Sequence, residues 1–201
     1  MKGSRSLTSD ERSMLRNYFD ERTDILAVRD KTLFFLSLYL GLRIAETLSI
    51  YARDVYKYDM VVDSIYILKR NTKGKIAGKI CLLNERAKSL LEDYFWHYGM
   101  LDRMKLSPSL PLFWSSKGTN AITTRQGARI FTKAYVACRL TGLNGCTHCT
   151  RKTFAKEMYK KLNKNILNLS IAMGHKNISS TQSYIQGDDE DIRNALTTLT
   201  F

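Results

Sequence analysis

The sequence has few of the residues that build disulfide frameworks, and it has no long apolar run. Four cysteines in 201 residues are too few for a disulfide scaffold of this length. The most apolar run, residues 32–42, is shorter than the roughly 20 residues that cross a bilayer. The chain opens Met-Lys-Gly-Ser-Arg-Ser, which is not a signal peptide. We therefore expect an intracellular protein with no membrane association, in the cytoplasm or nucleoid of a prokaryote or in the host cell of a virus.

Cysteine and histidine, the usual zinc ligands, are also scarce, and one short segment holds three of the seven. Cys146-Thr-His-Cys149 has the spacing of a zinc or redox motif. A closed zinc site needs four ligands, and the sequence offers only Cys138 and His148 nearby, with no second Cys-x-x-Cys. We therefore expect reduced thiols and no metal.

Acidic residues are outnumbered, since 32 Lys and Arg face 19 Asp and Glu for a net charge of +13. An excess of this size is typical of proteins that bind nucleic-acid phosphates. An anionic membrane surface would also attract it, but no predicted helix combines a basic face with a broad apolar one. Nucleic acid is the expected partner.

The periodicity predicts a mainly α-helical domain with a small β-hairpin, an α+β fold. Thr8 and Glu11 have the spacing of a capping box, and Gly41 is placed to end a helix. Residues 99–120, which contain both prolines, are predicted to be an irregular connector, and Trp96 and Trp114 to be core aromatics. Helices are predicted at 8–21, 24–40, 43–50, 85–98, 124–140, 150–162, 165–173, 178–185 and 189–198.

Residues 64–68 and 79–83 alternate as strands do and are joined by a turn at 71–75. The hairpin is strongly basic. Its cations are Lys69, Arg70, Lys73, Lys75 and Lys79. Two interpretations stay open: a solvated edge that discourages aggregation, or a finger that reaches a phosphate.

The last third of the chain contains basic residues and a tyrosine of the types needed to attack a phosphodiester. They are His148, Arg151, His175 and Tyr184. An Arg fork matches two phosphate oxygens, and two forks can replace a metal at a phosphodiester. A Tyr hydroxyl needs nearby cations or a base to attack phosphorus. A hairpin Lys could protonate the leaving oxygen. Earlier in the chain, Arg43 and Glu46 are three residues apart and share a helix face.

Three segments resemble the conserved boxes of the tyrosine recombinase (phage integrase) family. They are Gly41-Leu-Arg-Ile-Ala-Glu46, His148-Cys-Thr-Arg151, and the segment from Gly174-His175 to Tyr184. Their order and intervals match the family, as does a hairpin Lys between the first two. The resemblance covers residues 7–190.

The resemblance implies a role for each matching residue. Two arginines would clamp the scissile phosphate, two histidines would donate to its oxygens or relay protons, and a tyrosine would attack. These are, in order, Arg43, Arg151, His148, His175 and Tyr184, with Glu46 orienting the arginines. Lys75 would be the general acid, and Lys73 is the alternative. DNA contacts are expected from Lys69, Arg70, Lys79 and Lys152, of which Lys152 stands where the family often has His.

The implied activity is site-specific recombination of double-stranded DNA through a 3′-phosphotyrosyl intermediate. It would need no cofactor, because the covalent ester stores the bond energy. Self-association as a dimer or tetramer on DNA is expected, with accessory DNA-bending proteins as further partners. A type IB topoisomerase-like enzyme and a non-catalytic DNA-binding regulator are the alternatives.

The expected organisation has three parts. Residues 1–7 would be a flexible basic lead, 8–185 the catalytic domain, and 186–201 a tail that packs on a neighbouring protomer. The first box lies so early in the chain that the resemblance implies a short form, or a fragment, without the family's N-terminal core-binding domain.

Overall fold

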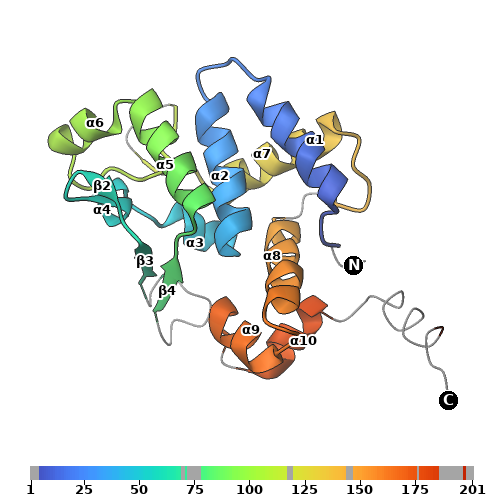
Figure 1. The fold of residues 1–201 in the computed structure, drawn as a ribbon. Helices are drawn as coiled ribbons and strands as arrows, with labels where there is room; N and C mark the ends of the chain where they lie inside the picture. The colour runs from blue at the N-terminus through green and yellow to red at the C-terminus, as the bar shows by residue number, and fades with distance from the viewer. Residues whose placement is uncertain are drawn as a thin grey trace. The chain divides into compact units, whose positions relative to one another are not determined.

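The computed structural model describes residues 5–68, 71, 78–116, 120–143, 147–175, 177–185 and 197 (Figure 1). The chain divides into two compact units, residues 1–154 and 155–201. The predicted fold class, mainly α with small antiparallel strand pairs, is confirmed. The elements are α1 (Ser9–Asp20), α2 (Ala27–Leu40), α3 (Ile44–Leu48), α4 (Ala52–Val55), β1 (Tyr56–Lys57), β2 (Met60–Val61), β3 (Ser64–Ile67), β4 (Lys79–Leu82), α5 (Glu85–His97), α6 (Met100–Leu106), α7 (Thr124–Ala137), α8 (His148–Lys161), α9 (Ile166–Met173) and α10 (Ile178–Ile185).

Helix α2 is the centre of the first unit. Most of its residues are buried, as expected of a helix that is apolar on nearly every side. It packs against α1, α3, α5 and α7, and Figure 1 shows it between α1 and α5. Gly41 ends the helix at φ +58°, a left-handed conformation that favours glycine. The chain turns there into α3.

An aromatic cluster fills the space between α1, α2 and α7. The ring of Phe34 lies 5.3 Å from that of Phe19 and 4.8 Å from that of Phe131, centroid to centroid. Such pairs add to the free energy gained from apolar burial. Trp114 is buried as predicted.

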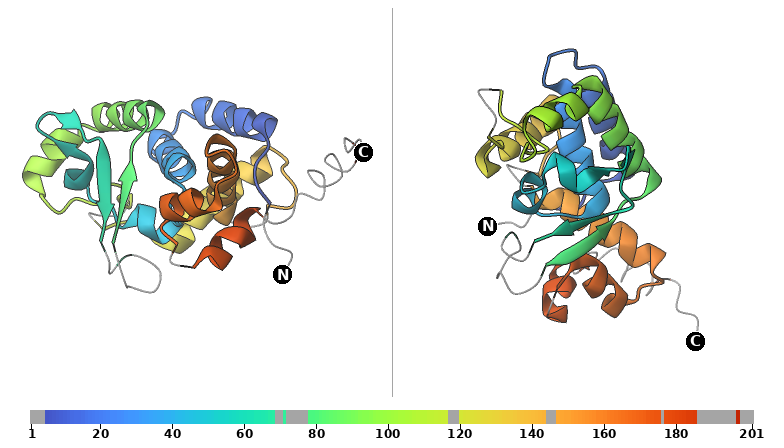
Figure 2. Two further views of the ribbon diagram at one scale, coloured as in Figure 1. Left: turned by 60° about the horizontal axis from the view of Figure 1, so that its bottom comes forward. Right: turned by 90° about the vertical axis from the view of Figure 1, so that its left-hand side faces the viewer.

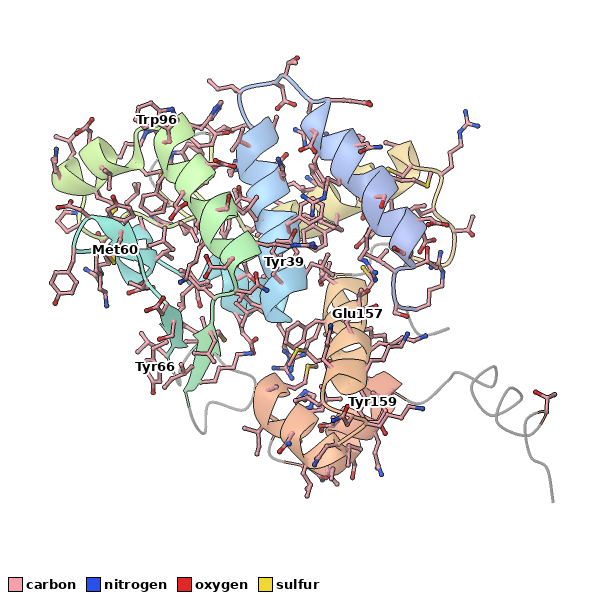
Figure 3. The ribbon with its side chains drawn as sticks, in the orientation of Figure 1. Tyr39, Met60, Tyr66, Trp96, Glu157 and Tyr159 are labelled. Carbon is pink, nitrogen blue, oxygen red and sulfur yellow. The ribbon has the colours of Figure 1, made fainter. Side chains whose placement is uncertain are left out.

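Trp96 contradicts the prediction, because 91% of its surface is exposed. Figure 3 places it at the end of α5. The inward face of α5 is formed by Leu91, Tyr94 and Phe95, and the next residue points about 100° away from Phe95 around the helix. Ile25 lies within the helix predicted at 24–40, but α2 begins only at Ala27, and Ile25 is exposed.

The start of the first unit is anchored. The predicted capping box between Thr8 and Glu11 is present at the start of α1. Leu7 is buried, and its N–H donates to Thr153 Oγ1 at 2.8 Å. Arg5 is paired with Glu11. Of the seven residues expected to form a flexible lead, the last is therefore part of the packed unit.

Strands β3 and β4 pair in antiparallel register with Ile67 opposite Lys79 and Ile65 opposite Cys81, side by side in both views of Figure 2. Ile65 and Ile67 face the core, whereas Tyr66, which Figure 3 labels, is exposed. The predicted hairpin strands are thus confirmed. Residues 72–77 of its turn lie outside the described residues.

Two features of the first unit were not predicted. Helix α6 lies within the stretch 99–120 that was expected to be irregular. Both prolines come after its last residue. Pro108 disfavours a helical conformation at Ser107, which is extended, so it stops the helix instead of preventing it. The short β1–β2 pair turns at Tyr58 and Asp59, both at positive φ. Glycine usually marks such a turn in a sequence, and neither position holds one.

The second unit contains the remainder of α8 together with α9 and α10, and the last two pack on each other. Asn165 caps the start of α9 and Gly174 ends it at φ +64°. The helix predicted at 189–198 and nearly all of the predicted tail lie outside the described residues. None of the helices described is long and apolar enough to cross a membrane.

Candidate active site

The first group of predicted site residues forms where α2 turns into α3. Arg43 is the N-cap of α3, and Glu46 is fully inside, with 1% of its side chain exposed. Glu46 Oε1 accepts from Arg43 Nη1 at 2.8 Å, and Glu46 Oε2 accepts from the Arg43 N–H at 3.0 Å. The carboxylate therefore caps the helix and fixes the guanidinium, as the three-residue spacing predicts.

Lys79, at the start of β4, joins this pair. Its Nζ lies 3.1 Å from Glu46 Oε2, and only 12% of its side chain is exposed. The sequence-based prediction was that Lys79 contacts DNA from the side of the hairpin. Its observed contact is with the buried carboxylate.

Arg151 reaches the same region from the first turn of α8. It is fully buried, and its Nη1 donates to the carbonyl of Gly41. A Cβ at Gly41 would collide with the ring of Phe154, so this turn needs glycine both for its φ and for the close approach of α8. His148 lies on the same helix face as Arg151, three residues earlier, and is exposed.

The cluster carries three positive charges, on Arg43, Lys79 and Arg151, against one negative charge on Glu46. Burial raises the pKa of Glu46, but the charge of Lys79, the hydrogen bonds from Arg43 and the charge of Arg151 outweigh it, so the pKa lies below its ordinary value. Burial lowers the pKa of Lys79, and the charge of Arg151 adds to this, whereas Glu46 and Cys81 oppose it. A buried excess of cations suits a bound anion.

The second unit holds the other two predicted residues close together. The rings of His175 and Tyr184 lie 5.4 Å apart, centroid to centroid, at an interplanar angle of 32°. His175 Nδ1 shares a hydrogen bond with Thr181 Oγ1 at 2.9 Å. Gly174 supplies the turn that ends α9 and leads into His175. Both side chains are half-buried.

Four of the predicted hairpin cations, Lys69, Arg70, Lys73 and Lys75, lie outside the described residues. Lys152 is half-buried on α8, next to Arg151. The pairing of Lys79 with Glu46 was missed by sequence reasoning. The alternation of residues 79–82 gives no signal for it, because it predicts Ile80 and Leu82 on the core-facing side, and the structure exposes both.

The described residues contain no group of three or more His, Cys, Asp or Glu side chains that could hold a metal ion. Cys146, the first residue of the Cys-x-x-Cys segment, lies outside them.

Glu46→Gln is expected to lower the stability of the fold in a pH-dependent way. At neutral pH the loss is roughly 3 kcal/mol, because Lys79 and Arg43 lose a buried counter-charge. Since the folded pKa of Glu46 lies below the ordinary value, the wild type holds this advantage above the unfolded-state pKa. The advantage disappears as the pH falls through the folded pKa. Thermal unfolding of both proteins between neutral and acidic pH measures the difference.

Asp63→Asn is the matched control. Asp63 lies 2.6 Å from Lys88, but 89% of its side chain is exposed, and surface pairs contribute little. Its unfolding temperature should stay close to that of the wild type at every pH. A pH-independent difference between Glu46→Gln and the wild type would contradict the assignment of Glu46 as a buried carboxylate of lowered pKa.

Comparison with known proteins identifies the family to which the chain belongs. The profile of the phage integrase family matches residues 5–191. The tyrosine recombinase XerC of Caldanaerobacter subterraneus subsp. tengcongensis is 27% identical over 193 residues, which are 94% of this chain and 49% of that protein. Tyrosine recombinase XerH of Campylobacter jejuni is 23% identical over 166 residues, 83% of this chain and 43% of that protein. The chain spans about half the length of these curated relatives.

Solved structures show the same fold. A XerH recombinase bound to a palindromic difH substrate, in a post-cleavage complex, matches with a TM-score of 0.74 and 20% identity over 96% of this chain and 52% of that one. The XerA recombinase matches with a TM-score of 0.73 and 20% identity over 98% of this chain and 65% of that one.

Proposed function

Because the chain belongs to the phage integrase family, we propose that it is a site-specific recombinase that cuts and rejoins DNA strands through Tyr184. The relatives it matches are named tyrosine recombinases. Similar folds have been solved with DNA substrates, among them XerH with difH and a lambda integrase dimer with a core site. These findings support DNA as the substrate and a covalent protein–DNA ester as the intermediate.

In the proposed reaction, the oxygen of Tyr184 attacks the phosphorus of a DNA phosphodiester and gives up its proton. The bond from phosphorus to the 5′ oxygen breaks, and that oxygen takes a proton and leaves as a hydroxyl. The DNA is then held to the protein by a 3′-phosphotyrosyl ester. A 5′ hydroxyl of the partner strand reverses the steps, so one ester replaces another and no nucleotide hydrolysis is needed.

The observation that carries the proposal is the buried excess of positive charge around Glu46. Arg43, Lys79 and Arg151 bring three cations to one carboxylate. A scissile phosphate contributes one negative charge, which increases further as the transition state forms. Fixed cations in a site of low dielectric stabilise that charge more strongly than water does.

Arg43 has the more accessible guanidinium of the two arginines. Its side chain is 23% exposed, and within the described part of the chain it bonds only to Glu46. The remaining N–H groups can donate to a phosphate. Arg151 has no exposed surface. The residues that cover it would therefore have to move before its guanidinium could contact a phosphate directly. In the observed conformation its charge acts on Glu46 and its Nη1 donates to the Gly41 carbonyl.

His175 is the proposed proton partner of Tyr184. Its ring lies against the tyrosine ring, and its Nδ1 is held by Thr181. Proton exchange with Tyr184 or with a phosphate oxygen would then use Nε2. His148 is proposed to donate to a phosphate oxygen, and Lys75 or Lys73 to protonate the leaving 5′ oxygen. Lys69, Arg70 and Lys152 are proposed to bind DNA.

Trapping of the covalent intermediate tests this proposal. The wild type is incubated with nicked duplexes that carry a randomised core, in which the cleaved end diffuses away and rejoining is blocked. An adduct that survives denaturation is expected, and sequencing of its DNA identifies the target. Mass spectrometry of the digested adduct should place the nucleotide on the peptide that contains Tyr184.

The same experiment separates the alternatives. No adduct from any duplex would favour a DNA-binding regulator. Relaxation of supercoiled plasmid without sequence dependence would favour a topoisomerase-like enzyme. Sequence-dependent adducts, followed by strand exchange between two duplexes, support a recombinase and, with it, the self-association that a synapse requires. Accessory DNA-bending proteins remain proposed partners.

A further inference from the structure

Lys79 stands on the core-facing side of a β-strand, where a cation is unexpected. It is paired with Ile67 across the hairpin, and Ile67 is buried. Residues opposite each other in a ladder point to the same face of the sheet. The next residue along the strand, Ile80, is exposed, as alternation requires. Lys79 therefore points to the interior while its apolar neighbour Ile80 faces solvent. A cation in the interior needs a compensating partner.

That partner is Glu46, whose two oxygens serve three donors. Oε1 accepts from the Arg43 guanidinium, and Oε2 accepts from the Arg43 N–H and lies 3.1 Å from Lys79 Nζ. The carboxylate is 1% exposed and the ammonium 12%. Any rotation of the Glu46 side chain would break contacts with both Lys79 and Arg43.

The electrostatics agree with this geometry. Burial disfavours the charge of Glu46, and Lys79 is the largest of the influences that bring its pKa below the ordinary value. Without the ammonium, the carboxylate would keep Arg43 as its contacting cation and would lose its strongest charge compensation. A buried carboxylate with weaker compensation tends to move toward water or to take up a proton.

We propose that Lys79 is a positioning residue of the cleavage site: through Glu46 it holds the Arg43 guanidinium in the orientation that receives the scissile phosphate. This rests on the proposed function, because it assigns Arg43 to the phosphate. Lys79 acts on the carboxylate, whereas the hairpin Lys75 or Lys73 is proposed to act on the leaving oxygen. The site then uses two lysines of the same hairpin for different tasks.

A double-mutant cycle on the full chain tests the assignment. Lys79→Met, Glu46→Gln and the double variant are compared with the wild type in adduct formation at saturating nicked duplex. Lys79→Met should slow adduct formation on the order of 10- to 100-fold, the size of effect expected when a catalytic group is displaced. Lys79→Arg, which keeps the cation, should restore most of the rate. In the Glu46→Gln background, Lys79→Met should lower the rate no further.

A measurement that needs no catalysis accompanies the cycle. Lys79→Met should lower the unfolding temperature by about 5–10 °C, because it leaves a buried carboxylate with one partner fewer. The same substitution in Glu46→Gln should have a much smaller effect. Lys88→Met is the matched control, since Lys88 pairs with an exposed carboxylate, and its unfolding temperature should change by less than about 2 °C.

Several outcomes would overturn the assignment. Equal, additive losses from Lys79→Met in both backgrounds would show that Lys79 does not act through Glu46. If DNA with sulfur in place of the bridging 5′ oxygen restored the rate of Lys79→Met, Lys79 would be the general acid, because a thiolate leaves without a proton. A loss of DNA affinity alone would make it a backbone contact. If the unfolding temperatures show that Lys79 and Glu46 are coupled but the wild type forms no adduct, the proposed function is refuted. The ion pair between Lys79 and Glu46 would still be supported.

Discussion

Replacement of Tyr184 by Phe is expected to abolish covalent attachment to DNA, by at least about 10⁴-fold, because the change removes the attacking oxygen. The aromatic ring remains, and with it the packing against His175, whose ring centroid lies 5.4 Å away. Folding and DNA affinity should therefore be unchanged. The measurements are adduct formation on the nicked duplex recovered with the wild type, thermal unfolding, and anisotropy of labelled DNA.

Tyr159→Phe is the control for this variant. Tyr159 is also half-buried, lies on α8 in the same unit as Tyr184, and loses the same single oxygen. Its adduct yield should match the wild type. If Tyr184→Phe still formed adducts, another residue would be the nucleophile, and the assignment carried over from the family would be wrong for this chain.

Arg151→Lys is expected to slow adduct formation by about 10²–10³-fold, the usual loss when one preorganised donor is removed from a site where charge develops. The variant keeps a positive charge but loses the planar fork. It can no longer donate to the Gly41 carbonyl and offer further N–H groups in the same geometry. The rate is measured at saturating DNA, so that a change in affinity does not enter.

Lys152→Met is the matched control, because it removes a full charge one residue away on the same helix. A modest loss of affinity with increased salt sensitivity is expected, with the rate at saturation near that of the wild type. Thermal unfolding of Arg151→Lys shows how much of its loss comes from the fold. A wild-type rate for Arg151→Lys would refute the role of its guanidinium.

Local signals predicted much of the helical framework. The capping box of Thr8 and Glu11 and the Gly41 stop are both present where the sequence predicts them. The Arg43–Glu46 pair is also local, since residues three apart meet on any helix. These predictions succeed because each depends on backbone geometry over one or two turns.

Predictions that needed knowledge of packing were less successful. Trp96 is exposed because α5 had already placed other large side chains inward. Helix α6 forms within the stretch 99–120, which the sequence predicts to be irregular. In both cases the neighbouring elements decided which face or segment could be buried, and intrinsic propensity is too weak to overrule them.

For the site, the sequence by itself determined the residue types, their order and the family to which they point. Only the tertiary structure decided that Lys79 turns inward to Glu46 and that Arg151 donates to Gly41. These contacts join positions 46 and 79, or 41 and 151, and they exist only when separate segments pack together. A buried carboxylate requires cations beside it, because an unpaired charge in the interior would remove a large part of the free energy of unfolding.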